Sequence, residues 1–173
     1  MTAEQTIDSN TSKTRLQEAA QRGIDLCRAG KWKAGMDILG RIAEADRQGT
    51  ELPGLFYSYL GYGIARYEKR GREGLALCQH AIKVQFYEPE NYVLLARVFL
   101  LRHRRGKAIE ALQKALQLNA RHPEAIKLAR EIGFRRRPVL PFLSRSHPIN
   151  KTLGKLRHSL TQGKSVDPTG NKI

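Results

Sequence analysis

The sequence repeats one helix-pair pattern three times, in residues 17–47, 55–85 and 90–119. Each segment holds an apolar helical stretch, a short turn rich in Gly, Lys and Arg, and a second helical stretch. The interval is 35 residues from Tyr57 to Tyr92, and 38 residues from Gly23 to Gly61. A near-constant period of this length is typical of helical arrays, in which each pair buries its apolar face on the next pair.

Small residues recur where the two helices of each pair would cross. In the third segment Tyr92, Ala96 and Phe99 fall on one helical face, by steps of three and four residues. The small residues at the expected crossings are Gly23, Gly35, Gly61, Gly74, Ala96 and Ala108. Small side chains let two helix backbones approach closely, so the pattern predicts packed antiparallel helix pairs.

This pattern resembles the tetratricopeptide repeat (TPR) family, and the resemblance covers roughly residues 15–122. It implies an all-α, right-handed superhelix of antiparallel helix pairs. The prolines usual at repeat ends are displaced to Pro53, Pro89 and Pro123. A plain helical bundle would also contain amphipathic helices, but the recurring small and large positions favour three TPR-like repeats.

We expect three regions along the chain. Residues 1–13 are polar and are predicted to be a disordered tail. Residues 14–134 form the repeat domain, closed by a capping helix that Pro123 opens. Residues 135–173 form a basic, proline-containing extension with a short amphipathic helix. Its apolar stretch 139–143 either folds back on the capping helix or docks on a partner.

The net charge of +15 is unevenly distributed, because 14 of these charges lie after residue 90. The second half would therefore attract an acidic protein surface, a nucleic acid or an anionic membrane. A basic contact patch is predicted in the third turn and in the extension. Its residues are Arg102, Arg104, Arg105, Lys107, Arg135, Arg136, Arg137, Lys151, Lys155 and Arg157.

The first helix of each repeat is expected to line a concave groove. The principal candidates are Gln21, Arg28, Tyr59, Tyr62, Arg66, Arg97, Lys127 and Arg130, and the register adds Gln17, Ser58, Val93, Leu94 and Leu101. This surface is aromatic and cationic. Arginine recognises carboxylates through paired hydrogen bonds, so the groove predicts an acidic or C-terminal peptide as ligand.

The sequence contains no pattern that predicts catalysis. Its five histidines lack zinc-ligand spacing, and no glycine-rich phosphate loop follows a strand. We therefore expect neither an enzyme nor a cofactor or metal site. Cys27 and Cys78 are expected to be buried apolar residues.

The start of the chain lacks the features of a secretory signal. No apolar run is long enough for a membrane span. These two observations predict a cytoplasmic protein.

The function predicted from these features is that of an adaptor or scaffold that binds a protein or peptide. Nucleic-acid binding is an alternative, although few aromatic residues interleave with the basic ones. Two more functions stay open, those of an accessory protein on an anionic membrane and of a small secretion-type chaperone. The strong positive charge is not expected for such a chaperone.

Overall fold

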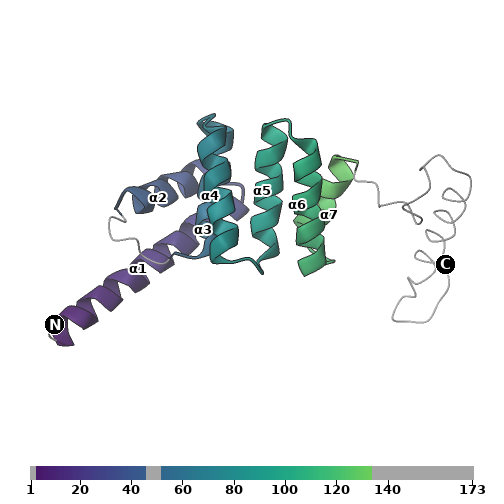
Figure 1. The fold of residues 1–173 in the computed structure, drawn as a ribbon. Coiled ribbons are helices and arrows are strands. Elements are labelled where there is room, and N and C mark those ends of the chain that lie inside the picture. The colour runs from purple at the N-terminus through teal and green to yellow at the C-terminus, as the bar shows by residue number, and fades with distance from the viewer. Residues whose placement is uncertain (1–2, 46–51, 134–173) are drawn as a thin grey trace, which may run out of the picture. The chain divides into compact units, whose positions relative to one another are not determined.

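A computed structural model describes residues 3–45 and 52–133, and this part of the chain is entirely helical (Figure 1). The helices are α1 (Ala3–Arg28), α2 (Trp32–Ala45), α3 (Gly54–Tyr67), α4 (Gly71–Val84), α5 (Pro89–Leu101), α6 (Arg105–Leu118) and α7 (Pro123–Glu131). The predicted all-α fold is confirmed. Among these helices none has both the length and the apolar character to cross a membrane.

The helices pack as three pairs, α1 with α2, α3 with α4, and α5 with α6. Each new pair begins with a helix that contacts both helices of the pair before it. Thus α3 packs on α1 and α2, and α5 packs on α3 and α4. The last helix, α7, packs on α5 and α6 in the same manner and covers the end of the array, as a capping helix does.

The predicted small residues lie at the helix crossings. A Cβ added to Gly74 of α4 would lie 2.2 Å from the carbonyl oxygen of Gly61 in α3. A Cβ added to Gly35 would lie 2.4 Å from the Cys27 sulfur atom and 2.8 Å from the Gly23 carbonyl oxygen. In the third pair, Ala96 and Ala108 are fully buried. The repeats therefore pack as closely as their sequence predicts.

The N-terminal boundary differs from the prediction, because α1 begins at Ala3 rather than after residue 13. No glycine or proline interrupts the sequence between Ala3 and Arg22, so nothing in the backbone chemistry ends the helix earlier. A polar composition is compatible with a solvated helix as well as with a disordered tail. The basic extension 135–173, with its predicted helix, lies outside the described residues.

Candidate functional site

Helices from all three repeats and the capping helix line a pocket of about 520 Å³. The walls come mainly from the first helix of each repeat, α1, α3 and α5, and from the start of α7. The side chains that define the pocket are Arg28, Trp32, Tyr59, Glu90, Val93, Leu94, Arg97, His122, Glu124 and Lys127. The pocket thus combines charged groups with an aromatic and aliphatic surface.

Six of the predicted groove residues meet in this pocket, and they are Arg28, Tyr59, Val93, Leu94, Arg97 and Lys127. The remaining predicted positions do not line it. Gln21 is exposed on α1, where its Nε2 donates a hydrogen bond to Asp25 at 2.8 Å. Arg130 is exposed on α7, and Ser58 is fully buried between helices. The positions that also lie off the pocket are Gln17, Tyr62, Arg66 and Leu101.

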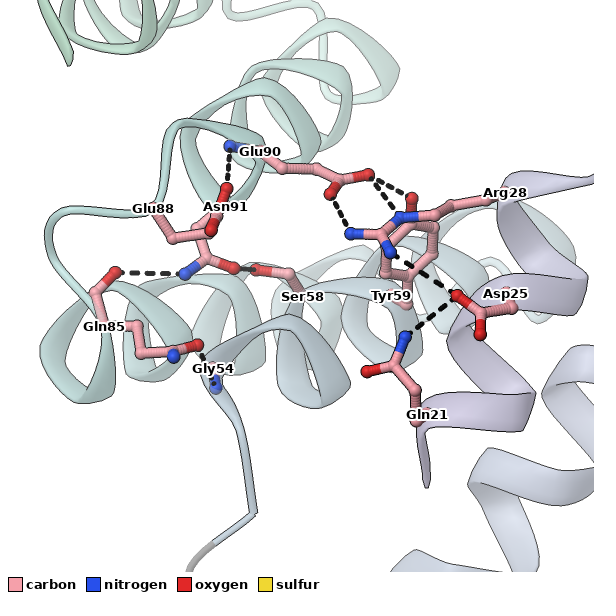
Figure 2. A network of polar contacts seen from close by, with 10 residues as sticks. All are labelled: Gln21, Asp25, Arg28, Gly54, Ser58, Tyr59, Gln85, Glu88, Glu90 and Asn91. Atoms are coloured by element: carbon pink, nitrogen blue, oxygen red, sulfur yellow. Dashed lines mark hydrogen bonds and ion pairs between the residues drawn. The ribbon is translucent and has the colours of Figure 1, made fainter. Parts of the chain in front are cut away.

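Glu90 at the start of α5 joins α1, α3 and α5 (Figure 2). Its carboxylate accepts hydrogen bonds from both Nε and Nη2 of Arg28, the former at 3.2 Å, and from the hydroxyl of Tyr59. Arg28 also contacts Asp25 at 3.4 Å. The backbones of α1 and α5 do not approach closely, so these long side chains make the bridge.

The electrostatics of this cluster favour a charged Glu90. Burial opposes ionisation of its carboxyl, but the hydrogen bonds from Arg28 and Tyr59 and the Arg28 charge outweigh it, and the pKa of Glu90 is lowered. Burial, followed by the hydrogen bond to Glu90, raises the pKa of Tyr59. Tyr59 is therefore a neutral donor to a carboxylate, and the cluster is satisfied without a ligand.

Two of the four arginines predicted for the groove already pair with acidic residues of the protein. Arg28 pairs with Glu90, and Arg97 on α5 pairs with Glu124 on α7. Lys127 has no ion pair among the described residues. The groove was predicted to be cationic, and its charges in the described pocket are nearly balanced, with Lys127 supplying the uncompensated charge.

An aromatic cluster supports one side of the pocket. The Trp32 ring lies 5.8 Å from Tyr59, 5.2 Å from Tyr62 and 6.0 Å from Tyr67, measured between centroids. Tyr62 is only 3% exposed, and the guanidinium carbon of Arg97 lies 5.8 Å from its ring centroid. Tyr59 and Tyr62 thus hold Trp32 and Arg97 in place rather than offering free aromatic surface.

A buried polar network fixes α3 against α5 beside this cluster (Figure 2). Ser58 donates through Oγ to Oδ1 of Asn91 at 2.7 Å, and Asn91 donates through Nδ2 to the carbonyl oxygen of Gln85 at 3.0 Å. Ser58 and Asn91 are both fully buried. Since they precede Tyr59 and follow Glu90 in the chain, their bond sets the register that brings Tyr59 to Glu90.

Seven residues that line the pocket were not predicted for the groove, and they are Cys27, Gly30, Trp32, His122, Pro123 and the two acidic partners, Glu90 and Glu124. A usable signal was present, because both acids follow a proline, Pro89 and Pro123, at a spacing of 34 residues. Acidic residues favour the first turn of a helix. The repeated Pro-Glu pair could have placed both carboxylates at equivalent positions facing the groove.

The described residues contain no group of three His, Cys, Asp or Glu side chains that could hold a metal ion. Cys27 and Cys78 are buried as expected. Burial raises the pKa of Cys27 to about 11 and that of Cys78 to about 12. Both thiols are therefore protonated at neutral pH and serve as packing groups.

The structure describes only four of the ten residues of the predicted basic patch. Arg102, Arg104, Arg105 and Lys107 lie at the turn between α5 and α6. Arg105 donates a hydrogen bond through Nη2 to the carbonyl oxygen of Ile132 beyond α7. The six remaining positions lie outside the described residues, and they are Arg135, Arg136, Arg137, Lys151, Lys155 and Arg157.

No protein-family model and no curated protein matches this sequence, but solved structures share its fold. MamA, residues 41 to the end, from Desulfovibrio magneticus RS-1 aligns with a TM-score of 0.54 and 14% identity, over 87% of this chain and 78% of that chain. A T3SS complex from Aeromonas hydrophila aligns with a TM-score of 0.51 and 18% identity, over 87% and 89%.

The first TPR of Spaghetti (RPAP3), bound to the HSP90 peptide SRMEEVD, aligns with a TM-score of 0.51 and 16% identity, over 70% of this chain and 90% of that chain. At identities of 14%, 16% and 18%, these comparisons are evidence about the fold alone. Together with the helix packing, they show that the chain has a TPR-like helical-repeat fold, as its sequence predicts.

Proposed function

We propose that this protein is a non-catalytic adaptor that binds a peptide segment of a partner protein in the pocket between α1, α3, α5 and α7. The observation that carries the proposal is the pocket itself, about 520 Å³ in volume and lined by every repeat and by the capping helix. A concave, partly apolar surface with a few convergent polar groups is the usual form of a binding site.

The charge of the pocket favours a peptide with an acidic residue near an apolar one. Lys127 is the unpaired cation of the wall, and it would attract a carboxylate at one end. Trp32 is half-buried and provides apolar contact area beside it, whereas Val93 and Leu94, 2% and 4% exposed, form the apolar floor of the pocket. The Spaghetti structure, which holds the acidic peptide SRMEEVD, supports this preference because a similar fold there carries a ligand of that kind.

The proposal can be tested through Trp32, the single tryptophan of the chain. Peptides selected from a random displayed library against the full chain are titrated while tryptophan emission is recorded. We expect the selected peptides to be enriched in Asp and Glu and to change the emission saturably. Reversing the charge in Lys127→Glu should weaken binding about five- to tenfold, because an attraction worth up to ~1 kcal/mol becomes a repulsion.

The matched control is Lys114→Glu, which reverses an exposed lysine on α6 away from the pocket. It should bind the selected peptides like the wild type. Peptides that bind both variants equally well, or that leave Trp32 emission unchanged at saturation, would show that the pocket is not the binding site.

A further inference from the structure

The turns inside the three repeats carry nearly all the excess positive charge of the described array. The turn edge comprises residues 29–33, 68–73 and 102–107, which contain nine Lys and Arg but two Asp and Glu, a net charge of +7. All described residues together, 3–45 and 52–133, carry a net charge of +8. The rest of the described surface is therefore almost balanced, and the charge is concentrated in these turns.

The three turns are neighbours in space. Trp32, in the first turn, contacts Tyr67 at the end of α3, with ring centroids 6.0 Å apart. The side chain of Arg102, in the third turn, lies over Gly71 in the second, where an added Cβ would be 3.5 Å from its Cγ. Figure 1 shows the α3–α4 and α5–α6 turns at the same edge of the array, opposite the connections from α4 to α5 and from α6 to α7. The cations thus form one continuous surface.

Most of these cations have no acidic partner within the part of the chain that the structure describes. Arg70 pairs with Glu68 at 2.8 Å and with Glu73 at 2.6 Å. The eight without an ion pair to any described residue are Lys31, Lys33, Lys69, Arg72, Arg102, Arg104, Arg105 and Lys107. Like charges held this close repel one another, so the edge creates a positive field that the described array does not neutralise.

Helix dipoles account for only part of this arrangement of cations, because α1, α3 and α5 end at this edge and favour positive charge there. Helices α4 and α6 begin at this edge, and positive side chains disfavour the positive end of a helix dipole. Their N-cap residues, Arg70 and Arg104, make no side-chain capping hydrogen bond. At the opposite edge, α5 and α7 begin with side-chain caps from Glu88 and His122. The cations at the starts of α4 and α6, Arg70, Arg72 and Arg104, therefore gain no stability from the dipoles of the helices that begin there.

We propose that the turn edge binds the phosphate backbone of a nucleic-acid duplex without selecting base sequence. Five of its nine cations are arginines, whose planar guanidinium groups match phosphate oxygens with paired hydrogen bonds. Affinity in such contacts comes largely from the release of counterions. A duplex presents its phosphates in a regular row. A row of cations over successive turns, without acidic partners among the described residues, can contact several of these phosphates at once.

The apolar surface beside the edge is concentrated at the first turn and does not follow the cations along the other two. Tyr67 and Leu101 are the large exposed apolar side chains of the described residues that lie at the adjoining helix ends. Tyr67 also lines a pocket of about 350 Å³ with Trp32 and Met36 beside the first turn, whereas Leu101 lies at the third. One such apolar site offers little for stacking along a single strand or for insertion into a membrane. An acidic protein would normally need apolar anchors at the centre of the contact. A predominantly electrostatic contact is thus favoured.

The test is fluorescence anisotropy of a labelled DNA duplex of about 20 base pairs, titrated with the full chain between about 50 and 300 mM NaCl. The edge variant is Lys69→Gln/Arg72→Gln/Arg104→Gln, which changes exposed side chains without an ion pair to any described residue. We expect its affinity to fall at least about tenfold at ~100 mM salt. The slope of log affinity against log salt should become shallower by about 2.7, since each phosphate contact contributes about 0.9.

The matched control is Arg41→Gln/Lys83→Gln/Lys114→Gln, which removes the same charge from exposed helix positions away from the edge. It should bind the duplex within about threefold of the wild type and keep its salt slope. The melting temperature of the edge variant should equal or exceed that of the control, because it removes cations from helix starts.

Three outcomes would overturn the proposal. Equal losses of duplex affinity in the edge variant and the control would show that only net charge matters. Tighter binding of the full chain to phosphatidylserine vesicles than to the duplex would assign the edge to a membrane, and tighter binding to poly-glutamate would assign it to an acidic protein. Binding of the peptides selected for the pocket should be unaffected by the edge variant, so the two proposals fail separately.

Discussion

Glu90 shows how much one side chain can change the character of a binding surface. It neutralises Arg28 and holds Tyr59, so two candidates for ligand recognition become parts of an internal cluster. Its side chain is only 18% exposed, which means that the cluster is screened less than an ordinary surface ion pair. The positions of these side chains, rather than their number, decide what the pocket can bind.

Glu90→Gln should destabilise the fold by roughly 1–2 kcal/mol at neutral pH, because the partly buried Arg28 would lose its carboxylate. The pKa of Glu90 in the fold is below its ordinary value of about 4.5. Its stabilising contribution is therefore complete above that value and is lost as the pH falls through the lower, folded pKa. Thermal melts of wild type and variant should differ by a few degrees at pH 7 and converge as the pH falls through the lowered, folded pKa of Glu90.

Glu110→Gln provides the control for this experiment, since Glu110 is exposed on α6 and has no ion pair among the described residues. Its melting curve should follow the wild type across the pH range. The proposed charge state of the cluster would be contradicted if the melting temperature of Glu90→Gln stayed equally far below that of the wild type at low pH, or fell further below it.

At the scale of the helices, the crossing glycines set how closely the two members of a pair approach. Gly74→Ala would place a Cβ 2.2 Å from the carbonyl oxygen of Gly61 and 2.7 Å from the Cβ of Ala65. Because backbone atoms must move to relieve the clash, we expect a loss of about 2 kcal/mol or more in the free energy of unfolding. Chemical denaturation measures this loss.

Gly40 in α2 is the matched control, since a Cβ added there meets no atom within 4 Å. Gly40→Ala should stabilise the protein by about 0.5–1 kcal/mol through helix propensity. Destabilisation of similar size in both variants would argue against the close crossing of α3 and α4.

The helix pairs could be predicted from the sequence because their signal is local. Gly61 and Gly74 lie in neighbouring helices, and the spacing of apolar residues shows which face of each helix is buried. The links between repeats could not be predicted in this way. Arg28 and Glu90 are 62 residues apart in the sequence. Their contact depends on how three helices stack, and the residue pattern within one repeat does not predict that stacking. The early start of α1 was missed because polar composition does not distinguish a helix from a disordered tail.

At the scale of the whole molecule, the charge of +15 does not describe one uniformly basic surface. Within the described residues the pocket is nearly neutral, whereas the turn edge holds a net charge of +7. The two surfaces adjoin at Gly30 and Trp32, but their charged side chains differ, and we expect them to bind different partners. Lys127 belongs to the first surface and Arg72 to the second, so charge changes at these positions should affect different ligands.

The central claim, that the pocket between the first helices of the repeats is the peptide site, is tested most directly by photocrosslinking. A peptide selected for binding to the full chain carries a photoreactive residue, and mass spectrometry identifies the attached positions. We predict crosslinks to residues around Trp32, Leu94 and Lys127, which excess unlabelled peptide suppresses. Suppressible crosslinks confined to the exposed surfaces of α4 and α6, with none in the pocket, would contradict it.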